Sequence, residues 1–133
     1  MNSVAVPQGS SLDWFITVVK KYAVFHGRAG RAEYWYFTLI WLLISVVLTL
    51  LDAILGTLHE PDGPGLLSGI FTFGLLLPSA AVTVRRLHDT DRRAWWMLLL
   101  FVPFVGPFAF LALMAFKGTP GENRFGTGPG EAV

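Results

Sequence analysis

The 133-residue sequence contains no cysteine and has few charged residues. Without cysteine the chain can form neither a disulfide framework nor a cysteine-ligated zinc site, and thiol chemistry is excluded. Only 14% of the residues are charged, against 53% that are hydrophobic. So few charges cannot cover a soluble core of this apolar content without leaving large exposed patches. We therefore expect a single domain that is embedded in a membrane.

Sequence motifs that carry known chemistry are also missing. The chain has no Walker loop, dinucleotide fingerprint, zincin motif, nucleophile elbow or paired-carboxylate signature. No metal-ligand spacing accompanies the histidines, and no nucleic-acid recognition module accompanies the basic residues. An enzyme is therefore not the favoured interpretation, and we expect no cofactor, no metal and no nucleic-acid partner.

Long apolar runs, by contrast, fill nearly half of the chain. Residues 35–55, 66–84 and 95–116 are each long enough to cross a hydrocarbon core about 30 Å thick at roughly 1.5 Å of rise per residue. These runs predict an all-α fold, a small polytopic membrane helix bundle with three transmembrane spans. The single membrane domain is expected to cover residues 11–118, after a flexible N terminus at 1–10.

The third run is interrupted near its middle by Pro103, Gly106 and Pro107. Proline removes a backbone donor and crowds the preceding turn, so a kink is expected there. The length matches one traverse, which favours a single kinked crossing and puts the polar tail, residues 119–133, on the extracytoplasmic side of the membrane. The same residues also permit a re-entrant hairpin, which would keep that tail inside.

Residues 12–25 carry apolar side chains at three- and four-residue spacing, with Lys20 and Lys21 elsewhere on the helical wheel. This pattern predicts an amphipathic helix. Such a helix lies in the membrane interface, or it packs against the cytoplasmic end of the bundle.

The distribution of Lys and Arg predicts the orientation of the bundle. Residues 1–34 and 85–94 hold four each, whereas the 56–65 loop holds none and carries Glu60 and Asp62. Short connections rich in Lys and Arg stay in the cytoplasm. We therefore expect the N terminus and the second connection to lie inside.

Two arginine-bearing segments, FHGRAGRAEYW and RRLHDTDRRAWW, flank the spans on that side. Guanidinium groups bind phosphate bidentately, which suits anionic lipid headgroups. Alternatively the charges satisfy one another, for example Asp89 with Arg85 or Arg93 at four-residue spacing. The candidate cluster comprises Arg28, Arg31, Glu33, Arg85, Arg86, His88, Asp89, Asp91, Arg92 and Arg93.

The segment after the last run, FKGTPGENRFG, is polar and rich in turn-forming residues. Its candidate motif residues are Lys117, Gly118, Gly121, Asn123 and Arg124. Together with GRAGRAEYW and RRLHDTDRRAWW, in this order and spacing, it resembles the bacterial inner-membrane family catalogued as domain of unknown function 805, the YhaH-like proteins. The resemblance covers roughly residues 12–129. It implies a small multi-pass protein of the cytoplasmic membrane and names no catalytic residue.

Two functions of different classes fit these observations. The first is a non-enzymatic inner-membrane protein whose arginine-rich cytoplasmic face binds anionic phospholipids or a partner, either a second copy or another membrane protein. The alternative is a small transporter or channel subunit that uses His88 and Asp52, which is the only ionisable residue inside the apolar runs.

Overall fold

A computed structural model of the chain describes residues 10–58 and 63–128. The predictions that concern residues 1–9, the loop acids Glu60 and Asp62, and the last five residues of the tail lie outside this range. Within it the chain forms six helices and no strand: α1 (Ser11–Lys20), α2 (Arg31–Leu55), α3 (Leu66–Gly74), α4 (Leu76–Asp89), the 3-10 helix η1 (Ala94–Phe101) and α5 (Gly106–Ala115). The all-α prediction is confirmed for the described residues.

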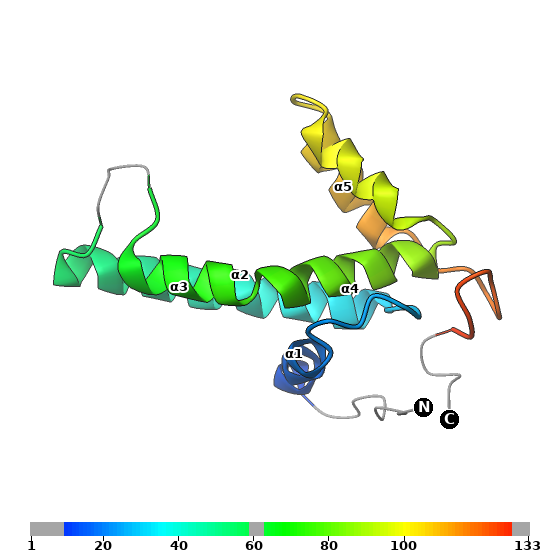
Figure 1. The fold of residues 1–133 in the computed structure, drawn as a ribbon, viewed down its shortest axis with the longest axis horizontal. Coiled ribbons are helices and arrows are strands. Elements are labelled where there is room, and N and C mark those ends of the chain that lie inside the picture. Colours follow the sequence, from blue (N-terminus) through cyan, green and yellow to red (C-terminus); the bar gives the residue numbers. More distant parts are fainter. Residues whose placement is uncertain (1–9, 59–62, 129–133) are drawn as a thin grey trace.

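Helix α2 and the rod formed by α3 and α4 lie side by side along the length of the molecule (Figure 1). α2 ends at Leu55 and is followed by Gly56, whose φ of 73° is the left-handed conformation that commonly terminates a helix. α3 and α4 meet at a 43° bend. Pro78 explains the bend, because it has no N–H to donate to the carbonyl of Gly74 and its ring crowds that turn.

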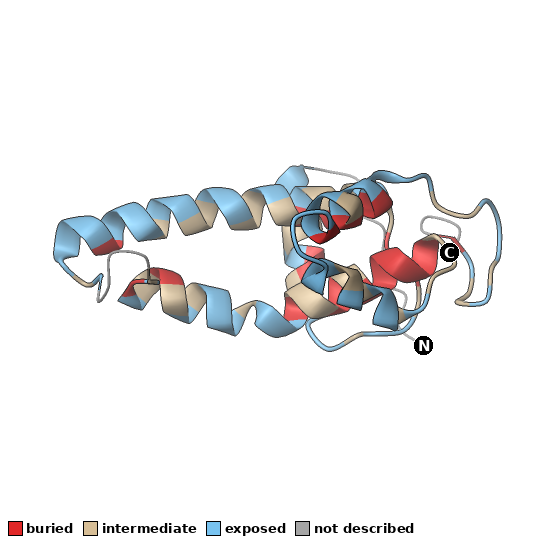
Figure 2. Cartoon of the chain, turned by 90° about the horizontal axis from the view of Figure 1, so that it is seen from above, coloured by how far each residue is buried: buried red, intermediate tan, exposed pale blue. Residues whose placement is uncertain are grey.

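The outer surface of these rods is apolar and open. Only 6% of the most apolar stretch of α2 is buried. Most buried residues gather at the end of the bundle opposite the α2–α3 loop, and a smaller group that includes Asp52 and Ser68 lies beside that loop (Figure 2). α2 alone has the length and composition of a span, and α3–α4 is a second one if the bent pair is counted together. The described helices therefore do not confirm three spans.

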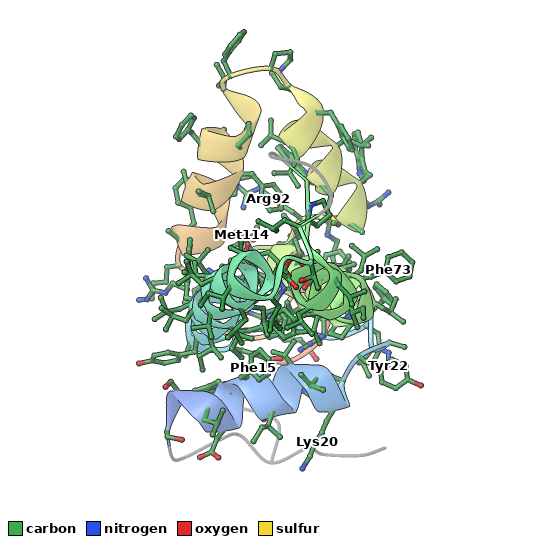
Figure 3. All side chains as sticks on the ribbon, turned by 90° about the vertical axis from the view of Figure 1, so that its left-hand side faces the viewer. Phe15, Lys20, Tyr22, Phe73, Arg92 and Met114 are labelled. Atoms are coloured by element: carbon green, nitrogen blue, oxygen red, sulfur yellow. The ribbon has the colours of Figure 1, made fainter. Side chains whose placement is uncertain are left out.

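Residues 95–116 do not form the single kinked crossing that their length favoured. η1 and α5 fold back on each other as a helical hairpin, which was the alternative (Figures 1 and 3). The chain reverses at Phe104, whose φ is 66°. Gly106 lets the two arms meet, because a Cβ at this position would collide with the backbone carbonyl of Leu99. The prediction was wrong because one traverse and two half-traverses need the same number of apolar residues.

Helix α1 ends at Lys20, five residues before the predicted end of the amphipathic segment. It packs against the bundle, with Phe15 stacked on Phe37 at 5.3 Å between ring centroids and with Val18 fully buried. Lys20 points away from the other helices (Figure 3). Of the two alternatives, the structure shows packing on the bundle. The position of α1 relative to a membrane interface stays a prediction.

The hydrophobic core lies where α1, α2, α4 and α5 come together. Its buried members are Val18, Ala29, Tyr34, Phe37, Val82, Leu87, Phe110, Leu113 and Met114. Trp35 supports this packing by donating from Nε1 to the carbonyl of Met114 at 3.2 Å. The base of the hairpin is therefore anchored to the start of α2.

At the other end of the bundle, Asp52 caps α3 from outside that helix. Its carboxylate accepts hydrogen bonds from the backbone N–H groups of Leu67 and Ser68, both at 2.8 Å, from the Ser68 hydroxyl at 2.8 Å and from the Thr57 hydroxyl at 2.6 Å. The carboxylate thus satisfies donors that a helix N-terminus leaves unpaired. His88 lies about 30 Å away, at 1.5 Å per residue along α3 and α4. The two residues named for a transporter or channel subunit thus lie at opposite ends of the bundle, and that alternative stays a prediction.

We predict that Asp52→Ala lowers the free energy of unfolding by about 1–3 kcal/mol, because four donors lose their acceptor. The matched control is Thr49→Ala on the same helix, whose hydroxyl bonds only the Ser45 carbonyl one turn back. Thermal unfolding in detergent, followed by helical circular dichroism, measures both. Equal stability of the two variants would contradict the capping role.

Candidate functional site

The three motif segments that are distant in sequence meet at the end of the bundle opposite Asp52. The loop between α1 and α2 joins the end of α4 through a hydrogen bond from the Ala29 N–H to the Arg85 carbonyl at 2.9 Å. The tail joins the same turn, where the Thr119 N–H donates to the Asp89 carbonyl at 2.7 Å. The backbone alone therefore brings the candidate residues together.

The carboxylate of Asp89 is the centre of the site. Its Oδ1 accepts a hydrogen bond from Arg28 Nε at 3.0 Å, and its Oδ2 accepts one from Arg86 Nη1 at 2.5 Å. All three side chains are buried, with exposed fractions of 5% or less. Burial lowers the pKa of Arg86, and the adjacent Asp89 carboxylate raises it again in part.

The remaining donors of these two arginines bind the backbone of the hairpin and the tail. Arg28 Nη1 donates to the carbonyl of Gly121 at 2.5 Å, and Arg28 Nη2 donates to that of Thr119 at 2.5 Å. Arg86 donates from Nε to the carbonyl of Met114 at 2.9 Å, and its Nη2 donates to that of Phe116. A guanidinium group has five donors, and here they fix the tail against the bundle.

A second buried ion pair joins Arg85 to Glu33 at the start of α2. Arg85 Nε also donates to the Val24 carbonyl at 3.0 Å, whereas Nη2 has no partner among the described residues. The predicted pairing of Asp89 with Arg85 or Arg93 is therefore wrong. Three buried arginines face two buried carboxylates, so the cluster retains one uncompensated positive charge.

His88 contacts the loop before α2 and the tail through its ring and its backbone. Its Nδ1 lies 3.0 Å from the Gly27 carbonyl, its ring stacks on Phe125 with 4.0 Å between centroids, and its own carbonyl accepts a hydrogen bond from Asn123 Nδ2 at 3.0 Å. Burial lowers the pKa of His88, and the hydrogen bond to Gly27 raises it by less. Nδ1 carries a proton, because the Gly27 carbonyl can only accept a hydrogen bond.

The other arginines of the predicted cluster, and Lys117 of the tail motif, lie at least partly open to solvent. Arg31, Arg93 and Lys117 are exposed, and Arg92 is half-buried, with its guanidinium 5.4 Å from the Trp96 ring. None of these four has an acidic partner within 4.0 Å in the part of the chain described. Arg124 pairs with Asp91 at 3.1 Å on the surface. The structure thus separates the arginines into a buried set and an exposed set.

Sequence reasoning missed several residues of the site. The acceptors Met114, Phe116 and Thr119 act through backbone carbonyls, which no residue type reveals. Gly118 was noted as part of the tail motif, and its role is steric: a Cβ there would collide with the Asp89 carboxylate. Among the described residues no group of three metal-ligating side chains comes together.

Comparison with known proteins finds a match that contains the same three segments. The family described as "Protein of unknown function (DUF805)" matches residues 22–127, which include all three motifs. The chain belongs to this family. Its relatives from Escherichia coli strain K12 include inner membrane protein YhaH, 48% identical over 89% of this chain and 97% of the relative, and inner membrane protein YhaI, 42% identical over 89% and 96%. No solved structure matches.

A more distant relative from the same strain is named uncharacterized protein YiiR. It is 31% identical over 77% of this chain and 83% of its own length. The chain is thus a helical protein of an uncharacterised family, with the exterior of a membrane protein, and its relatives carry no named activity.

We predict that Arg86→Ala lowers the free energy of unfolding by about 3–5 kcal/mol, because Asp89 loses a buried partner and three backbone carbonyls lose the hydrogen bonds that they accept from Arg86. Arg93→Ala is the control, since Arg93 is exposed and unpaired in the described structure. Thermal unfolding in detergent measures both. An unchanged melting profile for Arg86→Ala would show that this arginine does not stabilise the fold.

We predict that Gly118→Ala loosens the tail, because the added methyl group displaces the segment from the Asp89 carboxylate. Limited trypsin digestion should then cleave after Lys117 and Arg124 sooner than in the unmodified protein. Gly74→Ala is the matched control, since a Cβ at Gly74 meets nothing within 4 Å. Equal cleavage rates in both variants would refute the close fit of the tail.

Proposed function

We propose that the chain is an inner-membrane protein with two crossings and one re-entrant hairpin, whose basic cytoplasmic end binds anionic phospholipid headgroups. The relatives named inner membrane proteins support the location. α2 and the bent rod α3–α4 supply the two crossings. The binding role is supported by the charges and by the hairpin.

The observation that carries the proposal is the one-sided distribution of basic residues. All ten Lys and Arg of the sequence belong to segments that meet at the Asp89 end of the bundle. These are Lys20, Lys21, Arg28, Arg31, Arg85, Arg86, Arg92, Arg93, Lys117 and Arg124. By the positive-inside rule this end lies in the cytoplasm, where the leaflet surface is negative.

The hairpin supports a position beside one leaflet. Its most exposed residues are Phe101, Phe104 and Phe108, with exposed fractions of 80%, 90% and 76%. At about 2.0 Å per residue for η1 and about 1.5 Å for α5, each arm is roughly 15 Å long, which is half of a hydrocarbon core. An apolar hairpin of this length enters one leaflet and returns to the side from which it came.

The exposed basic residues lie where headgroup phosphates would be. We call Arg31, Arg92, Arg93 and Lys117 the basic surface. It adjoins the base of the hairpin, where Trp95 and Trp96 are exposed, and aromatic rings of this kind favour the interface. Because nearly all donors of the buried arginines already bind acceptors within the protein, the basic surface supplies the accessible charges for phosphate.

The test is lipid retention by the purified full-length protein, compared between phosphatidylglycerol and phosphatidylcholine by native mass spectrometry. We expect selective, salt-sensitive retention of phosphatidylglycerol. The triple variant Arg31→Gln, Arg93→Gln and Lys117→Gln should retain it at least about tenfold less well, since each basic residue near an anionic surface contributes about 1 kcal/mol. Asp91→Asn removes an exposed acid and should act in the opposite direction.

Equal retention of the two lipids, or a triple variant that binds as well as the unmodified protein, would overturn the proposal. A protein that copurifies stoichiometrically and is lost from the triple variant, with no change in lipid retention, would show that this end binds a partner protein instead.

A further inference from the structure

The two ends of the bundle differ in width. At the end near Asp52, the helices of the described chain are α2 and α3 alone, which lie side by side (Figure 1). At the Asp89 end, α1 and the hairpin of η1 and α5 pack beside α2 and α4. Seen along the rods, the hairpin projects from one side of the pair and α1 crosses the opposite side (Figure 3). The described part of the molecule is therefore wider at the Asp89 end.

The hairpin is too short to widen the other end as well. Its base is fixed where Trp35 bonds the carbonyl of Met114. Trp35 precedes Asp52 by 17 residues, which is about 25 Å along α2. Each arm of the hairpin is about 15 Å long, so even an arm parallel to α2 would end about 10 Å short of Asp52. The hairpin therefore adds its width to one half of the bundle.

Helix α1 adds width to the same half. Phe15 stacks on Phe37, which lies about 22 Å from Asp52 along α2. The axis of α1 runs across the rods and not along them (Figure 3). Its outward residues Leu12 and Ile16 are exposed apolar side chains one turn apart. In a membrane that α2 and the rod α3–α4 cross, α1 occupies area on the Asp89 side only.

The acyl chains of one leaflet are the occupant that fits the surface of the hairpin. Residues 94–116 contain no charged side chain, and Phe101, Phe104 and Phe108 are exposed on both arms and at the tip. A segment that is apolar on every side is typical of a hydrocarbon environment. A docked protein covers one side of such a hairpin, whereas lipid covers all of its open sides.

The added width is large compared with the two rods. A helix is about 10–12 Å across with its side chains, so the two arms of the hairpin roughly double the cross-section of α2 and the rod α3–α4. In a flat bilayer this extra cross-section crowds the lipids of one leaflet and leaves the other leaflet unfilled. A bend that makes the crowded leaflet convex relieves this mismatch, because a convex leaflet has more area than the leaflet opposite.

We infer that the protein senses membrane curvature, and that it accumulates where the leaflet around its Asp89 end is convex. With the Asp89 end in the cytoplasm, the favoured bend is a bulge of the membrane toward the cytoplasm. The inference rests on the two crossings and the re-entrant hairpin of the proposed function. It does not depend on the binding of anionic headgroups.

The test measures how the full-length protein distributes between giant vesicles of phosphatidylcholine and narrow tubes pulled outward from them. The chain has no cysteine, so Lys20→Cys supplies a single labelling site on a side chain that points away from the other helices (Figure 3). A membrane-impermeant dye added outside labels only the copies whose Asp89 end faces outward. Relative to lipid, these copies should be enriched in the tube at least about twofold. Copies of the opposite orientation, labelled before reconstitution and quenched from outside, should be depleted.

The variant Phe104→Asp tests whether the hairpin causes the enrichment. Phe104 is 90% exposed, so its replacement removes little packing within the protein, and aspartate tolerates its φ of 66°. A carboxylate at the tip is costly in hydrocarbon, so the hairpin should withdraw from the leaflet and the enrichment should fall. Phe104→Leu is the matched control, because it keeps an apolar tip and should keep the enrichment. Thermal unfolding in detergent checks that both variants are folded.

Equal density of the outward-facing copies in tube and vesicle would overturn the inference. So would the same enrichment for both orientations, since a wedge must respond with opposite sign, or an enrichment that Phe104→Asp leaves unchanged. If tags on the two termini lie on opposite sides of the vesicle membrane, the proposed topology fails and this inference fails with it.

The failure of this inference and the failure of headgroup binding are distinguishable. The tubes contain no anionic lipid, so a missing curvature preference leaves the retention of phosphatidylglycerol by the basic surface standing. Loss of that retention in turn leaves the curvature preference standing, because the hairpin and α1 produce it without the basic surface.

Discussion

One buried carboxylate holds three separate parts of this chain together. Asp89, at the end of α4, binds Arg28 from the loop before α2 and Arg86 from its own helix, and those two arginines bind the carbonyls of the tail. Removing such charges from water is costly, and the cost is offset only when nearly every donor finds an acceptor. The tail must therefore lie against the bundle. Because the hairpin connects α4 to the tail, it must return to the end of the bundle from which it started.

The apolar runs predicted much of the fold. The run at 35–55 lies within α2, and the run at 66–84 lies within the bent rod α3–α4. The run at 95–116 was misinterpreted, because length and composition do not distinguish a kinked crossing from a hairpin. What distinguishes them is tertiary: the contact of Gly106 with the Leu99 carbonyl, and the attachment of both hairpin ends to the same cluster.

The sequence predicted which residues make up the site, but not which ion pairs they form. Motif order identified the residues that converge, whereas helical spacing suggested the wrong partners for Asp89. Spacing along one helix cannot reveal Arg28, which lies 61 residues away in sequence. The same limit applies to Asp52, which resembled a functional membrane acid until the backbone N–H groups of α3 were seen to occupy it. Most of the missing partners are backbone groups, whose positions depend on the fold rather than on residue type.

We propose that the buried cluster keeps the tail on the same side of the membrane as the loop before α2. Topology reporters fused separately to the N terminus and to the C terminus of the full chain test this most directly. We expect both fusions to be active with a reporter that works only in the cytoplasm and inactive with one that works only in the periplasm. Opposite results for the two termini, with both fusion proteins still folded, would contradict the proposal, because the tail could not then reach Arg28 and Asp89.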